Sequence, residues 1–205
     1  MSRGEAHRFD PTILREYDIR GIVEETLSTD DAYAVGRAFG TEISLIGGVT
    51  VCVGYDGRLS SPEMEEAVVD GLKDSGIDAV RVGLGPTPML YFAVNVVGAD
   101  GGIMVSGSHN PPEYNGFKMM RGTKPFYGDA IQNLGKIAAA ADYADGSGQD
   151  RREPMLDRYV ARVGQDYTGG KELKVAWDAG NGSAGEAMVR VAEALPGEHL
   201  LLNEK

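Results

Sequence analysis

The sequence has one cysteine and no long uninterrupted apolar run. A single cysteine excludes a disulfide framework, and we interpret Cys52, inside the apolar run VTVCVGY, as a buried structural thiol. The longest apolar stretch, from Met89 to Val97, is far shorter than the ~20 residues that a membrane-spanning helix needs. We therefore predict no transmembrane segment and no partnership with a membrane.

Positive charge is also scarce, with 20 Lys and Arg against 31 Asp and Glu and a net charge of −11. Nucleic acids and anionic membranes both need a concentrated positive surface, so we exclude them as partners. The N-terminal MSRGEAHRFDP has no apolar run behind its basic residues, which excludes a secretory signal and predicts a cytoplasmic protein. Between Gly101 and Phe126 the charge is locally positive, because Lys118, Arg121 and Lys124 accompany a single acid. A small anion is a candidate ligand there.

Apolar runs alternate with amphipathic stretches, which indicates β-α-β-α units. We predict a three-layer α/β/α domain with a largely parallel mixed sheet, followed by the start of a second similar α/β domain. A serine cap is expected to begin a helix after Ser28 and another at Ser60. The expected strands are 49–54, 78–83, 102–106, 116–120 and 173–178. The expected helices are 29–46, 60–76, 89–97, 128–140, 155–163 and 186–195.

Composition divides the chain into two parts. Residues 1–141 form the predicted first domain, and the polar segment 142–154, rich in Gly, Ser and Asp, is the predicted linker. Residues 155–205 begin a second domain, in which the three leucines at 200–202 open a further strand. These elements bury too little surface to form a domain alone. We expect the natural protein to continue and this chain to be a truncated part; the alternative is a short protein that docks on a partner.

The stretch 104–120, MVSGSHNPPEYNGFKMM, is the most informative for function. It directly follows an expected strand, and in open parallel sheets ligands bind at the loops after the strands. Ser108 lies beside a glycine that permits unusual backbone angles, and Asn110 and two prolines stiffen the far side. Its hydroxyl is therefore accessible to an anionic substrate. His109 and Lys118 are near enough to move protons or to offset phosphate charge.

Other interpretations of this loop stay open. SGSHNPP has the composition of a plain turn, and a loop of this kind can also bind a phosphate without chemistry. A serine hydrolase is disfavoured, because adjacent residues in a tight loop are expected to point apart and triads are assembled from distant positions. The pattern G-x-S-x-G is not met either, since Asn110 stands where the second glycine belongs.

Four segments, in order, resemble the α-D-phosphohexomutases of the phosphomannomutase/phosphoglucomutase type. SGSHNPPEYNGFK at 106–118 resembles their active-site serine loop, with Ser106 where these enzymes usually have Thr. LREYDIRG at 14–21 resembles their N-terminal substrate-side segment. VGYDGRLSSPE at 53–63 resembles their phosphate-facing loop, and VAWDAGNGSAG at 175–185 the start of their second domain. The matches cover almost the whole chain.

The resemblance implies a reversible intramolecular phosphoryl transfer on hexose phosphates, between the 1- and 6-positions of mannose or glucose. In this family the serine is kept as phosphoserine, and its phosphoryl group passes to the sugar to form a hexose 1,6-bisphosphate. The other phosphate then returns to the serine. Carried over to this sequence, the catalytic residues are Ser108, His109, Lys118 and Arg20. The substrate-binding residues are Tyr17, Arg20, Lys118, Asn110 and Arg58.

The resemblance also implies magnesium, bound through the phosphate on Ser108. A hard divalent cation needs several oxygen ligands, and the family's Asp-Gly-Asp-Gly-Asp-Arg metal loop has no counterpart in the sequence. Its sugar-recognition loop and its C-terminal phosphate-binding domain have none either. We expect the remaining metal ligands beyond Lys205, on the other domains of the parent enzyme. The piece alone is then expected to lack mutase turnover.

Several alternatives concern single residues or the whole protein. Arg20 either serves the site or only pairs with Asp18 or Glu16. Arg58 either faces a phosphate or only caps its loop, and Tyr17 is either a substrate contact or an ordinary partly buried tyrosine. The turn 178–182 either approaches an anion through its N–H groups or is only a tight turn. At the level of the protein, the alternatives are a phosphoglucosamine mutase and a non-catalytic sugar-phosphate-binding protein of the same fold.

Overall fold

The computed structural model describes residues 4–205, so the predictions for residues 1–3 lie outside it. Its first part is built on a seven-stranded sheet with the order β1-β5-β4-β2-β3-β7, and β6 pairs with β5. Strands β4, β2, β3 and β7 are parallel to their neighbours in this order, whereas β5 runs antiparallel to β4, β1 and β6. The strands are β1 (Ile19–Ile22), β2 (Thr50–Tyr55), β3 (Asp78–Leu84), β4 (Gly101–Val105), β5 (Tyr114–Arg121), β6 (Lys124–Phe126) and β7 (Asp150–Arg152).

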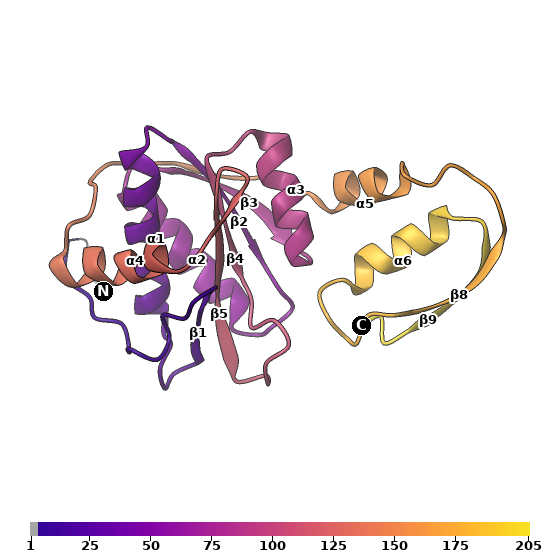
Figure 1. The fold of residues 1–205 in the computed structure, drawn as a ribbon, viewed down its shortest axis with the longest axis horizontal. Helices are drawn as coiled ribbons and strands as arrows, with labels where there is room; N and C mark the ends of the chain where they lie inside the picture. Colours follow the sequence, from indigo (N-terminus) through magenta and orange to yellow (C-terminus); the bar gives the residue numbers. More distant parts are fainter. Residues whose placement is uncertain (1–3) are drawn as a thin grey trace.

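Helices cover both faces of this sheet (Figure 1). On one face lie α1 (Thr29–Leu45), α2 (Ser61–Asp74) and α4 (Asp129–Ala140), and on the other lies α3 (Thr87–Val97). Each face has its own apolar core, the larger one including Phe39 and Phe117. Cys52 belongs to the smaller core, where burial raises the pKa of its thiol to about 12. The α/β/α prediction and the buried thiol are confirmed.

The two predicted serine caps differ in outcome. Ser28 caps α1 through a capping box, in which its side chain accepts from the Asp31 N–H and Asp31 accepts in return. Ser60 is the N-cap residue of α2, as predicted, but its side chain makes no cap hydrogen bond. Its hydroxyl instead accepts a hydrogen bond from Asn115 on β5, while proline in the first turn begins the helix.

Helices α1 and α2 approach closely because glycines face each other at their crossing. A Cβ on Gly71 would lie 2.3 Å from the Tyr33 carbonyl oxygen and 2.8 Å from the Arg37 nitrogen. A Cβ on Gly36 would lie 2.3 Å from the Val68 carbonyl oxygen. These are backbone atoms, so a side chain at either position forces the two helices apart.

Replacing Gly71 by alanine is expected to lower the free energy of unfolding by about 1–3 kcal/mol, the usual range for overpacking a tight core. Urea denaturation of the purified chain measures this. Gly164→Ala is the matched control, because nothing lies within 4 Å of a Cβ at that helical position. Equal stability of the two variants would show that the crossing can adjust without cost.

The predicted linker, 142–154, is held against the first sheet along much of its length. Its end forms β7, which pairs with β3. Before that, the N–H of Gly146 donates to the Asp74 carbonyl and the N–H of Gly148 to the Lys73 carbonyl. A Cβ on Gly148 would lie 2.1 Å from the Ile77 oxygen. Backbone hydrogen bonds therefore fix this polar segment in place. That it links two domains, and where the domain boundaries lie, stay predictions.

The second part contains α5 (Leu156–Gly164), β8 (Leu173–Asp178), α6 (Gly185–Ala194) and β9 (Gly197–Leu202). Strands β8 and β9 form a two-stranded parallel sheet, so the strand expected at 200–202 is present. The sheet is poorly covered, with Leu173 57% and Leu200 60% exposed. Across residues 4–205, none of the helices combines the length and the apolar character that crossing a bilayer requires.

Candidate active site

The candidate site lies at the carboxyl ends of β2 and β4, which run side by side in parallel with Tyr55 opposite Val105. The loops that follow these strands meet over a cleft of about 840 Å³. Its walls come from residues 56–60, from Pro86–Pro88, from the serine loop between Ser106 and Pro112, and from the turn 180–183 of the second part. Of the predicted site residues, the cleft is lined by Ser108, His109, Asn110 and Arg58.

Ser108 is exposed in the cleft and has a φ of 54°, in the left-handed region that few residues other than glycine adopt. Its backbone N–H donates to the Ser106 hydroxyl at 2.9 Å, which helps to fix this conformation. The Ser108 Oγ lies 3.2 Å from His109 Nδ1. The expectation that these neighbours point apart is thus wrong, since the left-handed residue turns the chain so that the two side chains meet.

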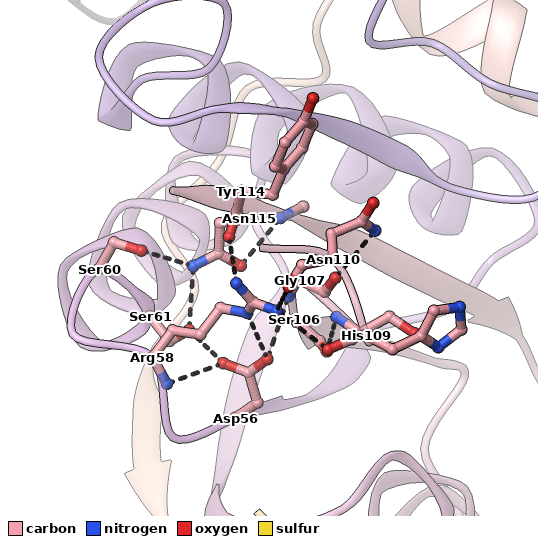
Figure 2. Close-up of polar contacts among 12 residues, drawn as sticks. Asp56, Arg58, Ser60, Ser61, Ser106, Gly107, His109, Asn110, Tyr114 and Asn115 are labelled. Atoms are coloured by element: carbon pink, nitrogen blue, oxygen red, sulfur yellow. Dashed lines mark hydrogen bonds and ion pairs between the residues drawn. The ribbon is translucent and has the colours of Figure 1, made fainter. Parts of the chain in front are cut away.

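Arg58 lies against the inner side of the serine loop (Figure 2). Its Nη2 donates to the carbonyl oxygens of Ser108 at 3.0 Å and Asn110 at 2.7 Å. Its Nη1 donates to those of Pro111 at 2.6 Å and Tyr114 at 2.9 Å. Its Nε forms an ion pair with Asp56 at 3.3 Å. The guanidinium thus gathers carbonyls from the whole loop into one bonded cluster.

Asp56, at the end of β2, is the carboxylate that connects this cluster to the sheet. It is buried, and its Oδ2 accepts from the Gly107 N–H at 3.0 Å. Its Oδ1 accepts from the Ser61 hydroxyl at 2.6 Å and from the Arg58 N–H at 3.1 Å. We did not single out Asp56 from the sequence, although its place directly after a predicted buried strand, beside Arg58, was a usable signal.

Asn115 on β5 is a second residue that the sequence analysis missed. Its side chain is fully buried and donates to the hydroxyls of Ser60 at 2.8 Å and Ser61 at 3.0 Å, at the start of α2. Its Oδ1 accepts from the Gly116 N–H. This amide connects β5, which follows the serine loop, to the segment after β2. The two segments on either side of the serine loop are thus fixed to each other.

Arg20 on β1 is buried and donates to both Asp18 and the carbonyl oxygen of Gly107. The Asn110 side chain donates to the same carbonyl at 3.1 Å. The two interpretations of Arg20 are therefore compatible, because one guanidinium pairs with Asp18 and also contacts the residue before Ser108.

Tyr17 and Lys118 are not among the lining residues of the cleft in the described part of the chain. Tyr17 is 74% exposed and its ring lies 6.1 Å from that of Tyr127. Lys118 is half-buried on β5, opposite Met104 on β4. The fold brings neither side chain into the wall of the cleft around Ser108.

The turn 178–182 faces this same cleft, with Gly180, Asn181 and Gly182 in its wall. Within the turn, Asp178 accepts from the Asn203 side chain at 3.0 Å and from the Gly180 N–H at 2.9 Å. These hydrogen bonds, that from Asn203 foremost, hold the pKa of Asp178 below its ordinary value. The Asp178 carboxylate thus serves to shape the turn.

The residues present do not fit a complete magnesium site. In the part of the chain that the structure describes, no group of three or more His, Cys, Asp or Glu side chains could hold a metal ion. Asp56, in the wall of the cleft, already accepts hydrogen bonds from Gly107, Ser61 and Arg58. Ser108 alone would offer phosphate oxygens if it were phosphorylated, and a divalent cation needs more ligands than that.

Comparisons with known proteins identify the family of this chain. Residues 11–144 match the family described as phosphoglucomutase/phosphomannomutase, alpha/beta/alpha domain I. A phosphomannomutase/phosphoglucomutase of Pseudomonas aeruginosa is 42% identical over 195 residues, which are 95% of this chain and 42% of that protein. A phosphoglucomutase of Neisseria meningitidis is 41% identical over 189 residues, or 91% of this chain and 41% of that protein.

A crystal structure of a phosphoglucomutase/phosphomannomutase family protein from Burkholderia thailandensis superimposes with a TM-score of 0.91 at 43% identity. The match covers 96% of this chain and 45% of that one. The chain thus spans less than half the length of these relatives. With the family match over most of its first part and relatives above 40% identity, this chain belongs to the phosphoglucomutase/phosphomannomutase family.

Proposed function

We propose that this chain is the part of a hexose phosphate mutase in which Ser108 carries the phosphoryl group. The observation that supports this most is the placement of its exposed hydroxyl over the cleft, at the carboxyl end of β4, on a loop whose carbonyls bond to Arg58. Phosphoryl transfer depends mainly on alignment and on neutralising charge. A serine held by Arg58 meets the first need, and the buried Arg20, which bonds to the Gly107 carbonyl, places positive charge near it for the second.

The reaction moves one phosphoryl group in each of two steps. In the first, the bond between phosphorus and Ser108 Oγ breaks and a bond forms to the free hydroxyl of a hexose 1- or 6-phosphate. The sugar hydroxyl gives up its proton and Ser108 Oγ gains one, so that serine ends as a free hydroxyl. The hexose 1,6-bisphosphate then reorients in the cleft. In the second step its other phosphoryl group passes to Ser108 Oγ, which gives up its proton, while the sugar oxygen that is released gains one. His109, with Nδ1 3.2 Å from Ser108 Oγ, is the candidate to move the proton. Arg20 would balance charge, and Asn110, in the wall of the cleft, would contact the sugar phosphate. The charge-balancing role implied for Lys118 and the substrate contact implied for Tyr17 would require these side chains to reach the substrate from outside that wall.

The remaining functions would belong to a longer protein of which this chain is a part, since the chain spans 42% of its Pseudomonas relative. Phosphorylated Ser108, together with ligands from that remainder, would hold magnesium, which would supply positive charge near the phosphoryl group. The substrates would be phosphates of mannose or glucose in the cytoplasm. The chain by itself would lack turnover.

Mass spectrometry of the full-length protein tests the proposed role of Ser108. We expect a phosphoryl adduct that a peptide map assigns to Ser108 rather than to nearby Ser106. Incubation with glucose 6-phosphate or mannose 6-phosphate should remove it, because the phosphoryl group passes to the sugar. Glucosamine 6-phosphate in parallel tests the phosphoglucosamine alternative. A serine that never carries phosphate, in a protein that still binds these sugars, would favour a non-catalytic binding protein.

A further inference from the structure

We propose that Arg58 and Asp56 form a positioning pair for the serine loop, and that Arg58 acts on phosphoryl transfer through this loop instead of binding the substrate. The proposal rests on the proposed function, in that Ser108 is taken as the phosphoryl carrier. The sequence left two roles open for Arg58, facing a phosphate or capping its own loop, and the proposal takes up the second.

The hydrogen bonds of Arg58 carry the argument. A guanidinium has donors on Nε, Nη1 and Nη2 in a fixed planar arrangement. Here Nε is paired with Asp56, Nη1 is shared between two loop carbonyls and Nη2 between two others. No N–H of this group is left over for a substrate phosphate. A substrate would have to break bonds that hold the loop.

These bonds also decide which groups of the loop face the cleft. A carbonyl oxygen carries partial negative charge and would repel a phosphoryl group. The carbonyls of Ser108 and Asn110 are bonded to Nη2 of Arg58, so their negative ends are directed to a cation. The loop therefore presents the Ser108 hydroxyl while the carbonyl oxygens of Ser108 and Asn110 point to Arg58 and away from the phosphoryl group.

Asp56 sets the position of this arrangement relative to the sheet. Its backbone N–H donates to the Val105 carbonyl at the end of β4, and its carboxylate binds both the Gly107 N–H and Arg58. The fit at Gly107 is tight, since a Cβ there would lie 2.0 Å from Arg58 Nε. The arginine and the glycine before Ser108 thus occupy positions that depend on each other.

The first experiment compares Arg58→Lys with Arg58→Met in the full-length protein. Lysine keeps the charge but lacks the planar set of donors, so both variants should lose about 10²-fold in kcat, the effect of misplacing a reacting group by about an ångström. KM for glucose 1-phosphate should change less than about threefold in both. Arg158→Lys, on the exposed face of α5, is the matched control. A raised KM with kcat retained in the lysine variant would overturn the proposal and make Arg58 a substrate ligand.

The second experiment needs no activity, so it separates this proposal from the proposed function. Hydrogen exchange of the Gly107 and Ser108 amides, which donate to Asp56 and Ser106, should quicken at least about tenfold in both Arg58 variants. The amides of β2 should stay protected, which shows that the fold persists. Unchanged exchange in the loop would refute the positioning role even if Ser108 is a phosphoryl carrier. Faster exchange in a protein that never labels Ser108 would support the positioning of the loop by Arg58 but refute the proposed function, and with it the effect of Arg58 on phosphoryl transfer.

Discussion

Ser108→Ala in the full-length protein is expected to slow hexose phosphate interconversion by on the order of 10⁴-fold or more. The nucleophile and the groups around it act together, so removing the nucleophile also removes most of what the other groups contribute to catalysis. The Ser108 Oγ is the atom that would form and break the bond to phosphorus. Conversion of glucose 1-phosphate to glucose 6-phosphate in a coupled assay measures the loss.

The fold should tolerate this change, since the Ser108 side chain is exposed and its contact with the sheet is through its backbone. Unfolding should therefore occur at nearly the same denaturant concentration as in the wild type. Ser44→Ala, at an exposed position on α1, is the matched control for activity. Substantial turnover by the alanine variant would mean that another group carries the phosphoryl or that the chemistry needs no covalent carrier.

Arg81→Met is expected to lower the free energy of unfolding by about 3–5 kcal/mol, the usual cost of leaving a buried charge without its partner. Arg81 is 7% exposed and its guanidinium contacts Glu65 at 2.5 Å, Glu66 at 2.7 Å and Asp150 at 2.8 Å. It therefore joins α2, β3 and β7. Without it, the buried carboxylate of Glu65 has lost its cation. Denaturant unfolding monitored by circular dichroism measures the change.

The loss should depend on pH in a defined direction. Burial raises the pKa of Glu65 even in the presence of Arg81, which opposes the rise. Removing Arg81 is expected to raise the pKa of Glu65 further. A carboxyl whose pKa is higher in the folded than in the unfolded protein destabilises the fold at pH values above these pKa values. This destabilisation disappears as the pH falls and the carboxyl is protonated. The deficit of Arg81→Met should thus be smaller at about pH 5.5 than at about pH 7.5.

The pKa of Asp150 is shifted in the opposite direction from that of Glu65, because the hydrogen bond from Arg81 lowers it. Its contribution to wild-type stability is present above the unfolded pKa and is lost only as the pH falls through the lower folded value, so it does not disturb a comparison between those two pH values. Arg162→Met is the control, because the ion pair between Arg162 and Asp166 is exposed. Its loss is expected to lower the free energy of unfolding by less than about 1 kcal/mol. A deficit that grows on acidification would contradict the role given to Glu65.

The main helices and strands were predictable because each contains a clear apolar period or a buried run. The strands β1, β6 and β7 were not predicted. They are four, three and three residues long, too short for alternation to be visible, and β7 reads Asp-Arg-Arg with all its side chains exposed. Pairing with an existing sheet forms β7, and the sequence of the segment itself does not contain that information.

For the site, the sequence located the loop and Ser108 because Gly, Asn and Pro have strong local preferences. It did not locate Asp56 or Asn115, whose importance comes from contacts with residues 51 and 55 positions away. It left open whether Arg58 faces a phosphate or caps its loop, and did not show that its guanidinium bonds to the carbonyls of the serine loop. A residue type limits what a side chain can do, whereas its direction is decided by packing between elements far apart in sequence.

The backbone at Ser108 has a last consequence. A serine with a φ of 54° is held in a region where the Cβ costs the folded chain about 1–2 kcal/mol relative to glycine. The amino acid best suited to folding at position 108 is therefore one that has no hydroxyl to phosphorylate. A screen that ranks variants by thermal tolerance alone would tend to select glycine here and discard the chemistry with it.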